Sequence, residues 1–323
     1  MNNQLSLLRG QVVASHGRHY LVELADHEVV SCFPRGKRSL VACGDIVAVI
    51  RTAADQGVIE AVDPRSTLLF RSDLYRQKLI AANVTQMVVV LAAVPSFYEE
   101  LLNRCLVAAE HQGIRALVVL NKFDLVDASA QALDALLVYR DLGYTVLPLA
   151  ARQDIEPLRG YLQGQLSLLI GQSGMGKSTI INALLPDADV AVGDISLALD
   201  SGRHTTTHAQ LHRLNDDTAL IDSPGMQEFG LLHLTQPEIA HGFVEFRLHL
   251  GLCRFNNCRH TGEPDCAIER AVAAGEISER RLSMYRRLLI DVERKRNKPS
   301  GAQTEQANPR QRKGVKTLRN ARR

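Results

Sequence analysis

The stretch Gly171-Gln-Ser-Gly-Met-Gly-Lys-Ser-Thr179 decides the fold. It matches the pattern G-x-x-x-x-G-K-[ST], follows the apolar run LSLLI at 166–170 and precedes the helical stretch STIINALL at 178–185. In such a loop the glycines let backbone N–H groups point at phosphate oxygens, and the dipole of the following helix favours negative charge. The order of strand, loop and helix therefore predicts a nucleotide site in an α/β domain. An ordinary glycine-rich turn would leave Lys177 unexplained.

Each position of this loop has an expected role in binding the nucleotide. Lys177 is expected to reach the β- and γ-phosphates, which makes it a candidate catalytic residue. Ser178 is expected to bind Mg²⁺, which bridges the same phosphates and neutralises charge that develops during transfer. The residues of the loop expected to bind the nucleotide are Gly171, Gln172, Ser173, Gly174, Met175, Gly176, Lys177, Ser178 and Thr179.

A second motif, Asn121-Lys122-Phe123-Asp124, ends the apolar run RALVVL and predicts that the base is guanine. The Asp124 carboxylate can accept hydrogen bonds from N1–H and the 2-amino group of guanine, whereas adenine offers no such pair of donors on that edge. Two buried acceptors facing each other repel, so the pocket would reject adenine. N-K-x-D alone is a short pattern, and a strand-end turn capped by an aspartate is its alternative. If the match is accidental, an ATP-dependent kinase or ATPase stays open.

Two further segments match the parts of a GTPase that respond to the γ-phosphate. Asp222-Ser-Pro-Gly225 follows the apolar run TALI; Asp222 would hold Mg²⁺ through water, and the Gly225 amide would contact the γ-phosphate. Gly202-Arg-His-Thr-Thr-Thr-His208 overlaps the end of a segment, about 186–204, that has no strong periodicity, which is typical of a switch loop. Thr206 is the threonine expected to close on Mg²⁺.

The order of these motifs is unusual, because the base-reading motif at 121 precedes the phosphate loop at 171. Ras-like GTPases have the phosphate loop first, so the elements here are circularly permuted. Permutation is physically acceptable where chain ends lie at the surface. One consequence is the hypothesis that the segment after Gly225 couples the nucleotide state to the C-terminal part of the chain.

The spacing of apolar runs predicts a multidomain architecture. Residues 9–70 contain five short alternating runs separated by turn residues, which indicates an OB-type β-barrel. Five continuous apolar runs then alternate with amphipathic stretches, which predicts a doubly wound parallel sheet. The predicted division is an OB-fold RNA-binding barrel at 1–72, a circularly permuted P-loop GTPase domain at 75–234, a zinc-binding helical domain at 235–295 and a disordered basic tail at 296–323.

Three of the six cysteines lie within fourteen residues, in the pattern Cys253-x4-Cys258-x-His260-x5-Cys266. Three thiolates and one imidazole satisfy the four-coordinate preference of structural zinc and leave no open position for catalysis. The alternative is a group of reduced cysteines near a surface histidine. The remaining cysteines lie in apolar surroundings and are expected to be inert: Cys32, Cys43 and Cys105.

Charge is distributed unevenly along the chain. Residues 294–323 contain eleven Lys or Arg and one acid, a net +10, so the remainder carries −7 to give the total of +3. Such a block is too polar to fold alone and is expected to contact nucleic acid, although a merely solvated tail is the alternative. Arg35, Lys37 and Arg38 in the barrel are equally consistent with an RNA-contacting face or a solvated loop.

The sequence also excludes several classes of protein. No apolar run approaches the ~18 residues of a membrane span, and the N-terminus lacks the pattern of a signal peptide. Six cysteines in 323 residues are too few for a disulfide scaffold. A cytoplasmic location without membrane contact is therefore expected.

Taken together, the motifs NKFD, GQSGMGKST, GRHTTTH, DSPG and C-x4-C-x-H-x5-C, behind an OB-like barrel, resemble the ribosome small subunit-dependent GTPase A family, known as RsgA or YjeQ. The resemblance covers about residues 9–295. It implies a GTPase that binds the small (30S) ribosomal subunit and its rRNA late in assembly. Conversion of GTP to GDP would be stimulated by that subunit and would time the release of the protein. The protein is expected to be a monomer. An RNA-binding assembly factor with vestigial hydrolysis is the alternative.

The resemblance also implies a catalytic role for His204. Met226 occupies the position where Ras-like proteins place a water-orienting glutamine, and an apolar side chain cannot position water. His204 is then the residue that would do so, although a loop histidine contacting RNA phosphate is nearly as good an explanation. Two departures from the family pattern are Ala150-Ala151, where Ser-Ala is common, and DSPG in place of DTPG.

Overall fold

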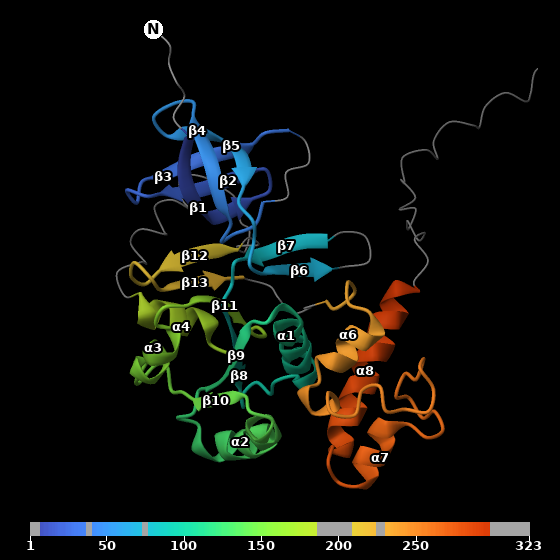
Figure 1. Cartoon of the computed structure of the whole chain (residues 1–323). Coiled ribbons are helices and arrows are strands. Elements are labelled where there is room, and N and C mark those ends of the chain that lie inside the picture. The colour runs from blue at the N-terminus through green and yellow to red at the C-terminus, as the bar shows by residue number, and fades with distance from the viewer. Residues whose placement is uncertain (1–6, 37–40, 73–76, 186–208, 224–229, 298–323) are drawn as a thin grey trace, which may run out of the picture.

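The computed structural model describes residues 7–36, 41–72, 77–185, 209–223 and 230–297. Within them the chain forms a small barrel, a central α/β domain and a C-terminal helical part, which lie side by side in Figure 1. Among the described residues, no helix has the length and hydropathy that a bilayer span requires. Several residues singled out in the sequence fall outside the described ranges: Lys37, Arg38, His204, Thr206, Gly225, Met226 and the tail from 298 onward.

The N-terminal strands close into a barrel, as the alternating sequence predicts. They are β1 (Leu7–His16), β2 (His19–Leu24), β3 (Val29–Pro34), β4 (Ile46–Arg51) and β5 (Gln56–Val62). The order β1-β2-β3-β5-β4 returns to β1, with β3 and β5 parallel and the other pairs antiparallel. Every second residue of β2 is buried, because side chains in a strand alternate between the two faces. The five-stranded barrel is confirmed.

The central sheet has the order β10-β9-β8-β11-β13-β12. Its strands are β8 (Gln86–Ala92), β9 (Arg115–Asn121), β10 (Thr145–Pro148), β11 (Leu166–Ile170), β12 (Gln210–Arg213) and β13 (Ala219–Asp222). All neighbours are parallel except β12, which pairs antiparallel with β13 at one edge. The five strands predicted from the sequence are therefore parallel as expected, and the antiparallel strand β12 is an addition that the sequence analysis missed. β12 has only four residues, one of them buried, so it gives none of the continuous apolar signal of a central strand.

Helices cover both faces of this sheet. They are α1 (Glu99–Gln112), α2 (Val126–Asp141), α3 (Glu156–Leu162) and α4 (Lys177–Leu184). Alternate residues of β8 belong to two different apolar clusters: Met87, Val89 and Leu91 pack with α1 and α2, while Val88, Val90 and Ala92 pack with α3 and α4. A strand with neighbours on both faces must be apolar throughout, which is the pattern seen in the sequence.

The barrel is joined to the central sheet by several contacts. β1 pairs with β12 through Ala14 and Gln210, and the Arg213 guanidinium donates to the Glu23 carboxylate at 2.5 and 2.9 Å. Gly44 has φ +90°, and a Cβ there would lie 2.3 Å from the Ala82 carbonyl oxygen. A hairpin of β6 (Leu68–Ser72) and β7 (Gln77–Ala82) connects the two parts along the chain.

The C-terminal part contains α6 (Gln236–His241), the 3-10 turn η1 (Val244–Phe246), α7 (Ala267–Ala273) and α8 (Glu279–Arg296). The sequence predicts helix throughout 267–295, but the chain breaks into two helices there. Gly275 with φ +78° turns the chain, and the Ser278 hydroxyl then caps α8 by accepting from the Arg281 N–H. The apolar cluster that contains α1 continues into this part through Phe243 and Tyr285.

Candidate functional site

The predicted phosphate loop lies between β11 and α4, at the carboxyl end of the parallel strands. Its glycines are required by close approaches. Gly176 has φ +93°, and a Cβ there would lie 2.3 Å from the Asn121 side-chain nitrogen; a Cβ on Gly171 would lie 2.3 Å from the Val90 carbonyl oxygen. Glycine is the residue that tolerates both restrictions.

Lys177 begins α4 and turns back into the loop. Its Nζ donates to the carbonyl oxygens of Gly171 at 2.7 Å and Gln172 at 2.9 Å. Burial lowers the pKa of Lys177, and the nearby Asp222 carboxylate opposes that shift. The ammonium group therefore lies at the centre of the loop, with the negative charge of Asp222 close by.

Asp222 ends β13, the neighbour of β11 in the sheet. Burial raises the pKa of this carboxyl group, while Lys177 and His212 lower it. Its Oδ1 atom is buried and has no hydrogen-bond partner among the described residues. A buried carboxylate oxygen without a partner is costly, so this atom is suited to a ligand that brings its own donor, such as a metal-bound water.

The second predicted motif lies beside the phosphate loop. Asn121 is 3% exposed; its Nδ2 donates to the Met175 carbonyl oxygen at 2.9 Å, and its Oδ1 accepts from the Ala151 N–H at 3.2 Å. Lys122 has φ +60°, and its Nζ donates to the Val94 carbonyl oxygen at 2.8 Å. Asn121 thus ties together three loops that are distant in the sequence.

A hollow of about 220 Å³ opens between these loops. The residues that line it are Asn121, Lys122, Asp124, Leu125, Ala151, Arg152, Gly176 and Thr179. Asp124 is exposed at its rim, free to accept from a base, and Phe123 packs instead against the apolar core beside it. Arg152 was not singled out in the sequence. The signal that could have found it is its place just after the strand-like run TVLPLA, where loops of a parallel sheet converge.

Gln172 has a role that its place in the motif does not reveal. Its Oε1 accepts from the Tyr98 N–H at 2.7 Å, at the N-terminus of α1. Ser173 and Ser178 are exposed, whereas Met175 is buried among apolar residues of the sheet and α4. The described loop residues are therefore brought together, while His204, Thr206 and Gly225 lie outside the described ranges.

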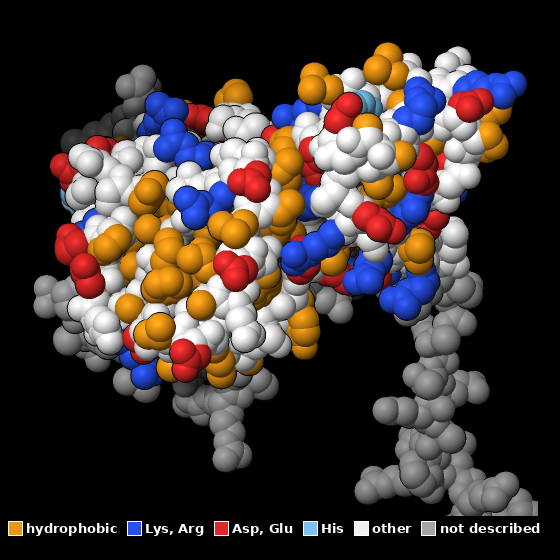
Figure 2. All heavy atoms as spheres, turned by 90° about the horizontal axis from the view of Figure 1, so that it is seen from below, with side chains coloured by type: hydrophobic (Ala, Val, Ile, Leu, Met, Phe, Trp, Pro, Cys, Tyr) orange, Lys and Arg blue, Asp and Glu red, His pale blue; other side chains and the backbone are white. Residues whose placement is uncertain are grey.

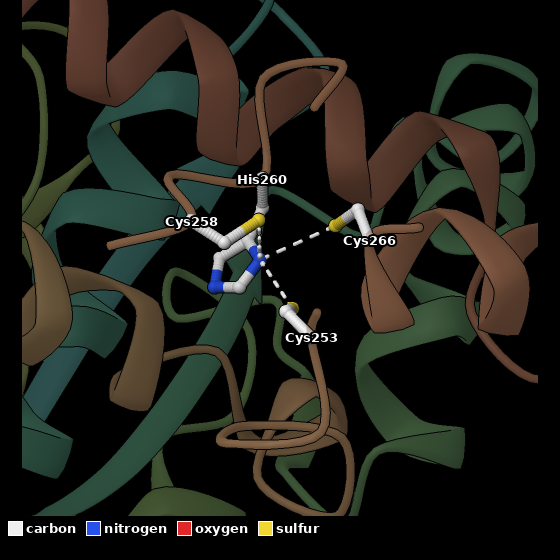
Figure 3. Close-up of side chains that lie close together, drawn as sticks. All are labelled: Cys253, Cys258, His260 and Cys266. Atoms are coloured by element: carbon white, nitrogen blue, oxygen red, sulfur yellow. Dashed lines mark hydrogen bonds between the residues drawn. The ribbon is translucent and has the colours of Figure 1, made fainter. Parts of the chain in front are cut away.

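The cysteine pattern forms one cluster at the start of the C-terminal helices (Figure 3). The ligand atoms of Cys253, Cys258, His260 and Cys266 all lie within 4.8 Å of one another. The His260 Nδ1 is 3.6 Å from the sulfurs of Cys253 and Cys258 and 3.4 Å from that of Cys266. Burial lowers the pKa of His260, which keeps the ring neutral, and raises the pKa of the Cys258 thiol to about 12. A thiolate forms there only against a cation, as metal ligation requires.

The three other cysteines lie apart from this cluster. Cys32, Cys43 and Cys105 are fully buried in the barrel, the junction and α1 respectively. Burial raises the pKa of the Cys105 thiol to about 12 and that of Cys32 to about 11. Thiols that stay protonated are poor nucleophiles, which agrees with the expectation of inert cysteines.

The fold and this site define a class of protein. The phosphate loop and the base-reading motif meet at the carboxyl ends of β11 and β9, as in P-loop GTPases, although their order along the chain is reversed. The chain is a circularly permuted P-loop GTPase.

Comparisons with known proteins identify the family. The family model described as RsgA GTPase matches residues 62–232. The small ribosomal subunit biogenesis GTPase RsgA of Nitrosospira multiformis is 57% identical over 297 residues, which cover 92% of this chain and 95% of that protein. The protein of the same name from Nitrosomonas europaea is 52% identical over 87% of this chain and 91% of its own length. The chain belongs to the RsgA GTPase family and is a GTP hydrolase.

Solved structures agree with this assignment. The crystal structure of YjeQ from Thermotoga maritima matches with a TM-score of 0.70 and 29% identity, over 89% of this chain and 99% of that one. YloQ, described as a circularly permuted GTPase, matches with a TM-score of 0.67 and 25% identity, over 93% of this chain and 99% of that one. The permuted arrangement predicted from the motif order is therefore confirmed.

Proposed function

We propose that this GTPase acts in late maturation of the small (30S) ribosomal subunit, hydrolysing GTP to GDP with stimulation by the subunit to time its own release. The observation that carries the proposal is the convergence of the phosphate loop and the guanine-reading motif on one hollow, held by the two hydrogen bonds of Asn121. The names of the relatives supply the subunit as the partner.

In this proposal the residues of the chain bind and orient GTP. Lys177 contacts the β- and γ-phosphates, and Asp124 accepts from the guanine edge. Mg²⁺, when bound, neutralises charge on the phosphates; Ser178 and Thr206 would hold it directly and Asp222 through water. The Asp222 Oδ1, which has no hydrogen-bond partner among the described residues, fits that role. We retain His204 as the proposed residue that orients the attacking water.

The metal of the cysteine cluster is proposed to be one structural Zn²⁺. Zinc binds sulfur at about 2.3 Å and imidazole nitrogen at about 2.05 Å, so a tetrahedral angle separates the two ligand atoms by about 3.6 Å. The observed separations of 3.4 and 3.6 Å agree with that value. Four protein ligands leave no position for a substrate, so the metal would hold the loop 253–266 against α7 and α8.

The partner contacts are proposed for three parts of the chain. The barrel at 1–72 and the helical part at 235–295 would contact rRNA. The nucleotide bound to the GTPase domain at 75–234 would control whether that contact is kept or released. Guanidinium groups on the surface of the barrel support this, among them Arg35, whose side chain is 73% exposed although it pairs with Glu60. We further propose that the protein acts as a monomer in the cytoplasm.

The test is GTP turnover, compared with ATP turnover, with and without purified small ribosomal subunits, using Lys177→Ala as the control. Stimulation by subunits that is confined to GTP and lost in Lys177→Ala supports the proposal. An equal rate of GTP turnover with and without subunits would contradict the proposal that the small ribosomal subunit is the partner. No turnover under either condition would favour an RNA-binding factor with a vestigial site.

A further inference from the structure

One face of α2 carries four apolar side chains, three of which are exposed, while Leu133 packs against the edge of the core. Val126 is 72% exposed and Leu137 41% exposed, Ala130 is exposed, and Leu133 is half-buried. These positions are spaced by four, three and four residues, so they form one stripe along the helix. In Figure 2, which views the central domain from below, hydrophobic side chains gather on this part of the molecule. We call these four residues the α2 stripe.

The α2 stripe borders a hollow next to the proposed guanine site. The hollow measures about 610 Å³ and is lined by Phe123, Asp124, Val126, Ala130, Leu133, Asp134, Ala150 and Gln153. It is therefore bounded by the start of α2 on one side and by the loop after β10 on the other. A large hollow beside exposed apolar side chains is a common feature of protein interaction sites.

The charge beside the stripe is negative. Asp127, Asp134 and Asp141 repeat every seven residues, so they line one edge of the stripe. Together with Asp124 they are exposed and make no ion pair with a described residue. Arg140 is the single basic residue of α2. A nucleic acid would be repelled by this face, whereas a basic segment with a few apolar residues complements it.

The chain itself contains such a segment. Residues 298–323 carry eight Lys or Arg and one acid, a net +7, and their large apolar residues are Val315 and Leu318, three positions apart. Both lie within the basic run Lys313-Gly-Val-Lys-Thr-Leu-Arg319. Because this segment is tethered to the same molecule, its effective concentration at α2 is far above that of a free partner.

The length of the segment is sufficient. Arg281, near the start of α8, lies 5.1 Å from the ring of Tyr139 on α2. At 1.5 Å per residue, α8 extends about 22 Å from Arg281 to Arg296, and α2 extends about 14 Å from Tyr139 to Ala130. The segment must therefore cover about 36 Å to return from the end of α8 to the stripe. The nineteen residues from Arg296 to Val315 can span about 63 Å when extended.

We infer that the α2 stripe and its hollow are a docking site for the basic segment 298–323 of this same chain. Val315 and Leu318 would occupy the apolar stripe, and the lysines and arginines beside them would pair with the aspartates of α2. A docked segment is withheld from nucleic acid, so it becomes available only where a stronger polyanion competes for it. The inference does not depend on GTP hydrolysis.

The experiment is carbodiimide cross-linking of the full chain followed by mass spectrometry, which joins carboxylates and lysine amines that are in contact. An equal mixture of ¹⁴N- and ¹⁵N-labelled protein separates contacts within a chain from contacts between chains. We expect Lys313 and Lys316 to join Asp127 and Asp134 within one chain. The yield should fall at least five-fold in the double variant Val126→Ser with Leu137→Ser, and also at high salt. Both substitutions are at exposed positions, so the fold should be retained, and circular dichroism verifies it.

Tyr161→Ser is the matched control, because Tyr161 is an apolar side chain 42% exposed on α3 of the same domain. Its cross-links should equal those of the parent protein. Three results overturn the inference: cross-links spread over acidic residues of the whole surface, an unchanged yield in the double variant, or joined peptides that mix ¹⁴N and ¹⁵N. Turnover of GTP, measured on the same samples, reports separately on the proposed function.

Discussion

Replacement of Arg281 by alanine is expected to loosen the C-terminal part from the GTPase domain. The side chains of Arg281 and Glu245 are 3% and 7% exposed, and their charged atoms are 2.5 Å apart. Arg281 also donates to the Asn103 Oδ1, and its guanidinium lies over the rings of Tyr139 and Phe243 at 5.1 and 4.7 Å. One side chain thus connects α8 to η1, α1 and α2.

The cost follows from what the substitution leaves behind. Removing one partner of a buried pair costs about 3–5 kcal/mol, because the other charge stays buried without compensation. Loss of the two cation–π contacts adds to this, at roughly 0.5–2 kcal/mol each, although such terms are not fully additive. We expect Arg281→Ala to reduce the free energy of local opening at α8 by at least about 4 kcal/mol.

The assay is native-state hydrogen exchange of peptides from α8 and α1, since a single unfolding free energy is not defined for a multidomain chain. Arg280→Ala is the matched control. Arg280 pairs with Glu99 at 2.7 Å but is 44% exposed, so its loss should cost less than about 1 kcal/mol. The reasoning is refuted if the two variants exchange alike. The double variant Arg281→Met with Glu245→Leu, which removes both charges, should recover most of the protection.

Three further predictions concern the other sites. Gly176→Ala should weaken GDP binding at least 100-fold in a fluorescence titration, because its Cβ would lie 2.3 Å from Asn121 at φ +93°; equal affinity would contradict the loop geometry. Burial favours a higher pKa for Glu23, but the hydrogen bonds from Arg213 lower the pKa overall. The stability that this pair gives the junction of β1 and β12 is therefore present above pH 4.5, and it is lost as the pH falls through the pKa of Glu23 in the folded protein. Glu23→Gln should therefore increase hydrogen exchange at this junction at pH 7, and the difference from the parent should shrink in acid; a difference that grows in acid would reverse the sign. Metal analysis should find one zinc per chain. The variant Cys258→Ser should lose both the zinc and the protection of α7 from proteolysis. If the parent protein without metal resists protease equally well, the metal is not structural.

Much of the nucleotide site was predictable because its chemistry requires particular residue types at fixed spacing. A phosphate loop needs glycine where the backbone approaches a neighbour, and Gly171 and Gly176 show those approaches. The barrel was predictable because alternation with period two appears in each short strand. The zinc pattern was predictable because its four ligands lie within one short segment.

Other features leave no local signal. β12 has four residues and is held at the edge of the sheet by β13 and by one pairing with β1, contacts made with distant parts of the chain. The burial of Arg281 also leaves no local signal. Because α8 is rich in charged residues, its sequence predicts that an arginine there is solvated, whereas in the fold η1 and α1 enclose Arg281. The break between α7 and α8 could have been predicted from the sequence, since Gly275 is a typical helix end and Ser278 a typical helix N-cap.

Helix α1 contacts both the phosphate loop and the C-terminal helices. In this chain α1 follows β8, whose carboxyl end faces the phosphate loop, and the Gln172 side chain binds the backbone just before the helix. Near the start of α1, Glu99 and Asn103 accept hydrogen bonds from Arg280 and Arg281 of α8. A movement of the phosphate loop must therefore either be absorbed in the few residues before α1 or displace a helix that shares a buried core with the C-terminal part. This contact route exists beside the one hypothesised through the segment after Gly225, and it is formed entirely by described residues.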